Sequence, residues 1–215
     1  MKSTSMRFGV MIALMVMTAG QSFGLVLYFD GGTHIISSEI NEYVWVDYNQ
    51  PGKQTSFILD PGGSVGNGLN LDGYCDSRLS VNGGSVGWDL IAHNNCLVTM
   101  TSGSIGNALV VRNNSVVTLY GGTIGSGIQL EDNAQLTIYG ISYALDGTPI
   151  DGGQYLTLPD SSGLLSVTFE GGETIDYQLD LIGTGQPSIF LDIPEPATLG
   201  FLVLGGLSLL KRRNA

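Results

Sequence analysis

The sequence contains four copies of one short motif: Gly62-Gly63-Ser64-Val65-Gly66, Gly83-Gly84-Ser85-Val86-Gly87, Ser102-Gly103-Ser104-Ile105-Gly106 and Gly121-Gly122-Thr123-Ile124-Gly125. Their first residues lie 21, 19 and 19 residues apart, and a further unit opens at Gly140, another 19 residues on. A unit of this size cannot bury an apolar face by itself, so neighbouring units must cover one another. The repeat therefore predicts a solenoid.

Apolar residues recur at fixed places within the units. The aligned columns are Leu69, Leu90, Leu109 and Ile128; Leu71, Ala92, Val111 and Leu130; Leu79, Val98, Val117 and Leu136; and Val81, Met100, Leu119 and Ile138. Their alternation with polar residues predicts short strands that turn one face inward. The threonines Thr99, Thr118 and Thr137 fall between inward positions, so we expect them to point outward.

These features predict an all-β chain folded as a right-handed parallel β-helix. The left-handed form normally repeats in sixes, and a period of 19 is not a multiple of six. Pairs such as Asn94-Asn95 and Asn113-Asn114 separate the expected strands, and Asn and Gly suit corners because both tolerate left-handed backbone angles. An antiparallel sandwich with accidental repetition is the alternative fold.

The chain divides into five segments by composition. They are residues 1–24, a secretory signal; 25–61, an opening cap; 62–142, the repeats; 143–187, a strand-rich C-terminal cap; and 188–215, a linker with a sorting signal whose helix spans 197–210. Terminal units of solenoids are usually atypical because they must cover an apolar end.

The first 24 residues have the order of a secretory signal peptide. Lys2 and Arg7 precede an apolar stretch at 8–17, and small and polar residues follow. We expect a helical leader that signal peptidase cuts between Gly24 and Leu25. A retained N-terminal anchor is the alternative.

The C-terminus has three parts in a fixed order. Pro194-Glu195-Pro196 precedes an uncharged run at 197–210, which would be about 21 Å long as a helix. Lys211, Arg212 and Arg213 follow and would stay on the cytoplasmic side of a membrane. A C-terminal core helix of a soluble domain is the alternative interpretation.

This tail resembles the PEP-CTERM sorting signal of bacteria that secrete exopolysaccharide. The resemblance implies a membrane-anchored precursor that an exosortase-type enzyme cuts near Pro194-Glu195-Pro196, leaving the product at the cell surface or outside the cell. The strand-rich segment 143–187 resembles the module often found before such tails, although only as a loose pattern. The resemblance says where the chain goes and not what it does there.

The charge of the chain excludes one class of partner. Residues 25–196 contain only three basic residues, Lys53, Arg78 and Arg112, against all nineteen acidic residues, which gives a formal charge of −16. Such a surface repels nucleic acid, and it repels anionic polysaccharide unless cations bridge the two.

Two cysteines suggest a disulfide bond between neighbouring units. Cys75 and Cys96 lie 21 residues apart, which is the spacing of the first two motif copies. Equivalent positions on adjacent turns would meet the geometry of a disulfide, and exported proteins encounter oxidising conditions. We therefore expect a Cys75–Cys96 bridge, with two free buried thiols as the alternative, because the longer first unit can displace Cys75.

Residues for catalysis or metal binding do not group in the sequence. His34 and His93 lie far apart, and we expect His93 to be an exposed turn residue. The acids Asp72, Asp89 and Asp132 are scattered, so we predict no catalytic, cofactor or metal site; Ca²⁺ between acids of neighbouring corners has no motif in its support.

Two functions remain in competition. The first is a non-enzymatic surface or matrix protein, associated with extracellular polysaccharide through outward Thr, Asn and Ser ladders and through Tyr120 and Tyr139, one period apart. The second is a small carbohydrate-active enzyme, a lyase or hydrolase, with a groove along the solenoid.

Overall fold

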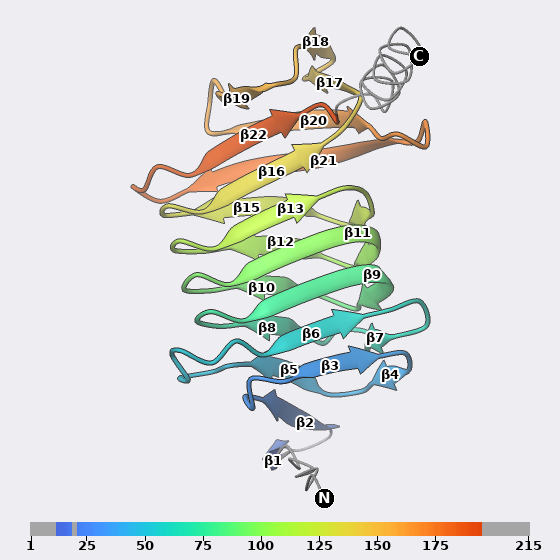
Figure 1. Ribbon diagram of the computed structural model, residues 1–215, viewed down its shortest axis with the longest axis vertical. Helices are drawn as coiled ribbons and strands as arrows, with labels where there is room; N and C mark the ends of the chain where they lie inside the picture. The colour runs from blue at the N-terminus through green and yellow to red at the C-terminus, as the bar shows by residue number, and fades with distance from the viewer. Residues whose placement is uncertain (1–11, 19–20, 195–215) are drawn as a thin grey trace, which may run out of the picture.

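Two long sheets, which we call sheet A and sheet B, run the length of the molecule (Figure 1). The computed structural model describes residues 12–18 and 21–194. Within these ranges every regular element is a strand, and there is no helix long and apolar enough to cross a membrane. The predicted all-β class is confirmed.

Sheet A contains eleven strands. Their order is β1 (Ile12–Thr18), β2 (Gln21–Tyr28), β5 (Tyr43–Val46), β8 (Leu71–Gly73), β10 (Leu90–Ala92), β12 (Ala108–Val111), β15 (Gly127–Glu131), β21 (Thr174–Ile182), β20 (Ser162–Thr168), β17 (Ser142–Leu145) and β18 (Thr148–Ile150). Strands β2 to β21 in this order pair in parallel, as a β-helix requires.

Sheet B faces sheet A across the core. Its order is β19 (Gln154–Leu156), β22 (Ser188–Asp192), β16 (Gln135–Tyr139), β13 (Val116–Leu119), β11 (Leu97–Ile105), β9 (Arg78–Val86), β6 (Ser56–Leu59) and β3 (Thr33–Ile36), with β14 (Thr123–Ile124), β7 (Ser64–Val65) and β4 (Glu39–Ile40) completing the turns. In Figure 1 the chain runs rightward along sheet B in front, returns leftward along sheet A behind and climbs toward the C-terminal end. The coil is therefore right-handed.

The motif copies stack on one another as predicted. Val65 pairs with Val86, Val86 with Ile105, and Ile105 with Ile124, and none of the four is more than 7% exposed. The columns that begin at Leu79 and Val81 also stack in register. Burying each such side chain contributes roughly 1.5–3 kcal/mol, so the repeated apolar columns are the main source of stability.

The first unit departs from the predicted alignment. Leu71, and not Leu69, pairs with Leu90, while Val65 still pairs with Val86. The two additional residues of this unit therefore lie at 66–70, between β7 and β8. A corner can absorb an insertion, whereas a strand cannot do so without shifting its side chains out of register.

The corners have the expected backbone. Asn94, Asn95, Asn113 and Asp132 all have positive φ, between 49° and 67°. Side chains at these corners also connect neighbouring turns, since the Asn113 amide donates to Asp132 at 3.1 Å. Asparagine and aspartate therefore serve both the local turn and the stacking of turns.

Antiparallel strands close the C-terminal end. β20 pairs antiparallel with β21 and with β17, and β19 pairs antiparallel with β22. Residue 188 does not begin a linker as predicted, because Ser188–Asp192 forms β22, the last parallel strand of sheet B. Ile189 and Leu191 face the core there, which explains why this segment joins the coil.

The N-terminal end differs from the expected leader helix. Ile12–Thr18 forms β1, which pairs antiparallel with β2. The parallel pairing of β2 with β5 and of β3 with β6 shows that segment 25–61 is an opening turn continuous with the repeats. In the folded chain, β1 pairs with the edge of β2. An isolated leader peptide has no such partner, which is why the segment is a strand here and not a helix.

Candidate functional site

The outer surface of sheet B carries ordered columns of side chains. Thr99, Thr118 and Thr137 pair directly and are half-buried on the outer face, as predicted. The next two members of the same column are Phe190 and Tyr155, which pair with each other across β22 and β19. The column therefore changes from hydroxyls to aromatic rings toward the C-terminal end.

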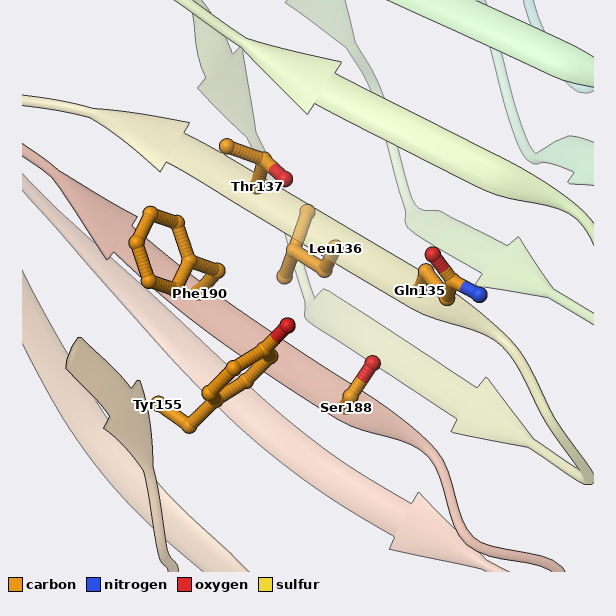
Figure 2. Close-up of a pocket in the computed structure, with 6 residues that line it drawn as sticks. All are labelled: Gln135, Leu136, Thr137, Tyr155, Ser188 and Phe190. Atoms are coloured by element: carbon orange, nitrogen blue, oxygen red, sulfur yellow. The ribbon is translucent and has the colours of Figure 1, made fainter. Parts of the chain in front are cut away.

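A half-open pocket of about 160 Å³ lies where the column changes (Figure 2). Its lining consists of Gln135, Leu136, Thr137, Tyr155, Ser188 and Phe190. In Figure 2 Tyr155 extends from β19 across β22 toward β16. Tyr155 is 70% exposed as a residue, and its ring meets that of Phe190 at an angle of 62°, with the ring centroids 5.1 Å apart.

A second pair of rings lies on the same face. Tyr120 and Tyr139 are stacked at 4.6 Å with their planes 12° apart, which confirms that these tyrosines are neighbours one period apart. Tyr139 follows Thr137 by two residues in β16, so both point outward. Burial, followed by the nearby Tyr120 and Asp192, raises the pKa of the Tyr139 hydroxyl.

We call Tyr120, Tyr139, Tyr155 and Phe190 together the aromatic face. Exposed rings present flat apolar surfaces, while the hydroxyls of Thr137 and Ser188 offer hydrogen bonds beside them. The six residues that line the pocket carry no carboxylate and no basic group. This combination suits an uncharged ligand with alternating apolar and hydroxyl surfaces, about the size of one sugar ring.

The sequence pointed to only half of this face. Tyr120 and Tyr139 could be found because they lie one period apart, but Tyr155 and Phe190 lie outside the repeat. They meet because β19 returns antiparallel along β22. The available signal was the apolar alternation around each residue, which predicts strands but not which strands pair.

The predicted Cys75–Cys96 bridge is wrong: both cysteines are free. The register of β8 and β10 puts Cys75 beside Asn94, two residues away from the level of Cys96. Cys96 instead lies next to Ser77, whose hydroxyl donates to its sulfur at 3.3 Å. The insertion at 66–70 causes the displacement.

His93 is also placed differently from the prediction. It stacks on Tyr74 with the rings 4.5 Å apart and 2° from parallel, and its side chain is only 17% exposed. Its Nε2 lies 3.8 Å from the Asp72 carboxylate. Trp45 and Tyr48 pack against Tyr74 at 6.0 and 4.9 Å, so these rings form one cluster with His93.

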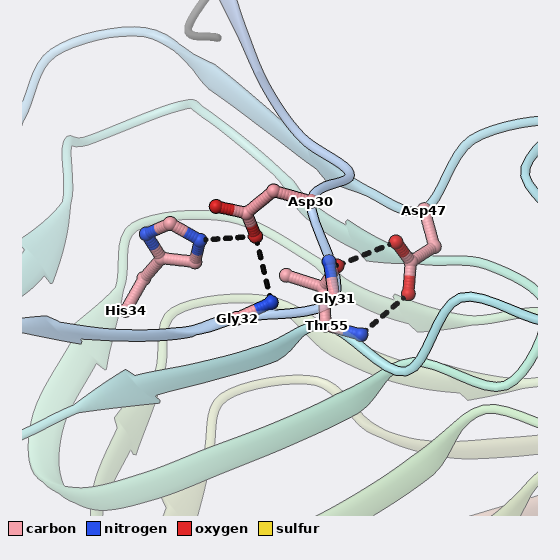
Figure 3. Close-up of polar contacts among 6 residues, drawn as sticks. All are labelled: Asp30, Gly31, Gly32, His34, Asp47 and Thr55. Carbon is pink, nitrogen blue, oxygen red and sulfur yellow. Dashed lines mark hydrogen bonds and ion pairs between the residues drawn. The ribbon is translucent and has the colours of Figure 1, made fainter. Parts of the chain in front are cut away.

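His34 belongs to a polar network in the opening turn (Figure 3). Its Nε2 lies 2.9 Å from Asp30, and this contact is the main reason that the pKa of Asp30 is lowered. The buried Asp47 accepts hydrogen bonds from the Thr55 amide at 2.8 Å and from its hydroxyl at 2.7 Å. The Thr55 hydroxyl oxygen in turn accepts from the Gly31 amide, so the network ties the opening turn together.

The acidic residues form hydrogen bonds or ion pairs with separate partners. Asp89 accepts from the Asn107 amide at 2.8 Å, and Glu131 pairs with Arg112 at 3.0 Å. Across the described residues no three His, Cys, Asp or Glu side chains are arranged to hold a metal ion.

Most of the predicted sorting residues lie outside the described ranges. Pro194 ends the described chain, while Glu195, Pro196, the run at 197–210 and the basic residues Lys211, Arg212 and Arg213 lie beyond it. The predicted cut between Gly24 and Leu25 falls within β2. These sorting assignments stay predictions.

No protein family, curated protein or solved structure matches the chain.

Proposed function

We propose that the protein is an exported, non-enzymatic component of the cell surface or extracellular matrix that binds neutral polysaccharide through the aromatic face. The leader directs export and is cut before Leu25. The PEP-CTERM-like tail then anchors the precursor until an exosortase-type enzyme processes it at Pro194-Glu195-Pro196. After both cuts, the solenoid remains as the functional part of the protein.

The pocket beside Tyr155 is the observation that carries the binding role. A sugar ring has an apolar C–H face that packs on an aromatic ring, and hydroxyls at its edge that need polar partners. Tyr155 supplies the ring, and Thr137, Gln135 and Ser188 supply the polar groups within one lining. The stacked pair of Tyr120 and Tyr139 extends this surface beyond a single sugar.

Charge favours a neutral polymer over an anionic one. The segment 25–196 has a formal charge of −16, so an anionic chain would be repelled over the whole surface. The rigid pairing of β13, β16 and β22 fixes the face before binding, which lowers the entropic cost of association.

Hydrolysis requires more than this site provides. Glycoside hydrolases of the common type place two carboxylates on either side of the bond to be cut, about 5–10 Å apart. The pocket lining has none. This favours retention of a sugar chain over its cleavage.

The test is retention of the exported protein on a panel of neutral and anionic polysaccharides, with new reducing ends assayed in parallel. We expect retention on at least one neutral polymer without cleavage. Tyr155→Ala should weaken binding about tenfold, which corresponds to roughly 1.4 kcal/mol for loss of one stacking ring.

Tyr48→Ala is the matched control, because Tyr48 is also an exposed tyrosine, at 42%, but belongs to the ring cluster around Tyr74. It should leave retention unchanged. New reducing ends would favour the enzyme alternative, and retention that survives Tyr155→Ala would place the binding elsewhere.

A further inference from the structure

The two ends of the coil protect their strand edges very differently. At the C-terminal end the outermost strands are β18 and β19, each only three residues long, and β18 contains Pro149. Short edge strands and proline are the usual means by which proteins prevent pairing with another chain. The strand edges at this end are therefore short, and the edge of β18 is also interrupted by proline.

At the N-terminal end the edge of β2 is covered by β1 alone. The two strands pair antiparallel from Ile12 with Leu27 to Thr18 with Gln21. All of β1 lies within the predicted leader, so cleavage before Leu25 removes the covering strand. What remains is an uncovered edge at Leu25–Tyr28, where no side chain is charged and no residue is proline.

The backbone of this edge is free to accept a new strand. The Asp47 amide donates to the Tyr28 carbonyl at 2.7 Å, so the polar groups of Tyr28 face β5. By alternation along the strand, the N–H and C=O groups of Leu25 and Leu27 face the outer edge. Val26 and Tyr28 point into the coil, so the loss of β1 also uncovers apolar surface at the open end.

We propose that leader removal switches the protein from a monomer to a head-to-head dimer in which β2 pairs with β2 of a second copy. β1 shows that this edge takes an antiparallel partner, and a two-fold axis supplies one, because it presents the same strand in the opposite direction. The edge of β3 lies at the same end of the coil, so the same axis brings its copies together as well. The proposal rests on the export processing proposed above.

The test begins with the full-length chain exported from a bacterial host, with its N-terminus identified by mass spectrometry and its mass in solution measured by sedimentation. We expect a chain that starts at Leu25 and forms a dimer. Added salt should strengthen the dimer, because each copy carries a formal charge of −16 over residues 25–196.

Leu27→Pro tests the edge itself. It removes an N–H that faces outward and no hydrogen bond within the coil, so the folded monomer should persist while the dimer dissociation constant rises at least tenfold. Leu27→Ala keeps the N–H and should still form the dimer. If Leu27→Pro lowers the melting temperature sharply, Leu27→Lys tests the same edge without changing the backbone, because a charged side chain on an edge strand discourages pairing with another chain.

Failure of leader removal and failure of the β2 edge to pair give different experimental results. If the leader remains attached, the export proposal fails, and the edge is tested with a full-length chain that carries a specific protease site at residues 19–20. Cutting that chain and removing the released strand should convert monomer to dimer. A cut or mature chain that stays monomeric, or a dimer indifferent to Leu27→Pro, overturns the inference.

Discussion

The residues at one inner corner of the coil all have small side chains. Thr55, Ser77, Cys96, Ser115 and Ala134 occupy this corner on successive turns, and none has exposed surface. A Cβ on Gly73 would lie 2.5 Å from the Cys96 sulfur, so the thiol fills space that a larger neighbour would need. Burial raises the pKa of Cys96 to about 12, which keeps this cysteine an unreactive packing group.

At the same scale, the Asp30–His34 contact predicts a pH dependence. The pKa of Asp30 is lowered in the folded protein, so its contribution to stability is present above the ordinary carboxyl pKa and is lost as the pH falls through the lowered value. Urea unfolding at pH 6 and pH 3 should show a smaller loss of stability in Asp30→Asn than in the wild type. Asp160→Asn, on an exposed residue, is the control, and an equal loss in both variants would contradict the prediction.

At the scale of elements, the last glycine of each motif allows the turns to approach closely. A Cβ on Gly87, Gly106 or Gly125 would lie 2.1–2.5 Å from the carbonyl oxygen of the equivalent glycine on the preceding turn. The motif repeats glycine here because backbone lies directly against backbone. The glycine repeated at this position thus reflects contact between turns, not only the shape of one turn.

Gly106→Ala should therefore destabilise the protein by roughly 2–3 kcal/mol, because neither the carbonyl nor the strands that hold it can move easily. Gly171→Ala is the matched control, since a Cβ there meets nothing within 4 Å and no positive φ is involved. Chemical denaturation measures both. A Gly106→Ala variant as stable as Gly171→Ala would show that the turns can separate at little cost.

At the scale of the whole molecule, each turn contacts mainly the turns on either side. The C-terminal cap is attached to the last repeats through β15 with β21 and β16 with β22, and the Tyr177 hydroxyl donates to the Gly122 carbonyl at 2.6 Å. Stability in such an architecture is close to a sum over turns and their interfaces. Length can then change without loss of the fold, provided that the register is kept.

Deletion of residues 102–120, one full period of 19, should give a shorter folded solenoid, because Thr101 then continues into Gly121 at the same phase of the coil. Circular dichroism should retain the strand signal, with a moderately lower melting temperature. Deletion of residues 102–110 is the control, since it breaks the phase and should prevent folding. If both deletions unfold the protein, the turns are more interdependent than their contacts indicate.

The sequence alone determined the coil, its inward columns, its outward threonines and the pairing of Tyr120 with Tyr139. All of these depend on contacts between residues one period apart, which a repeat makes visible. Only the tertiary structure decided where the first unit absorbs its insertion, and with it the separation of Cys75 from Cys96. It also decided that His93 is stacked and that Tyr155 meets Phe190, because these contacts arise from register shifts and antiparallel returns outside the repeat.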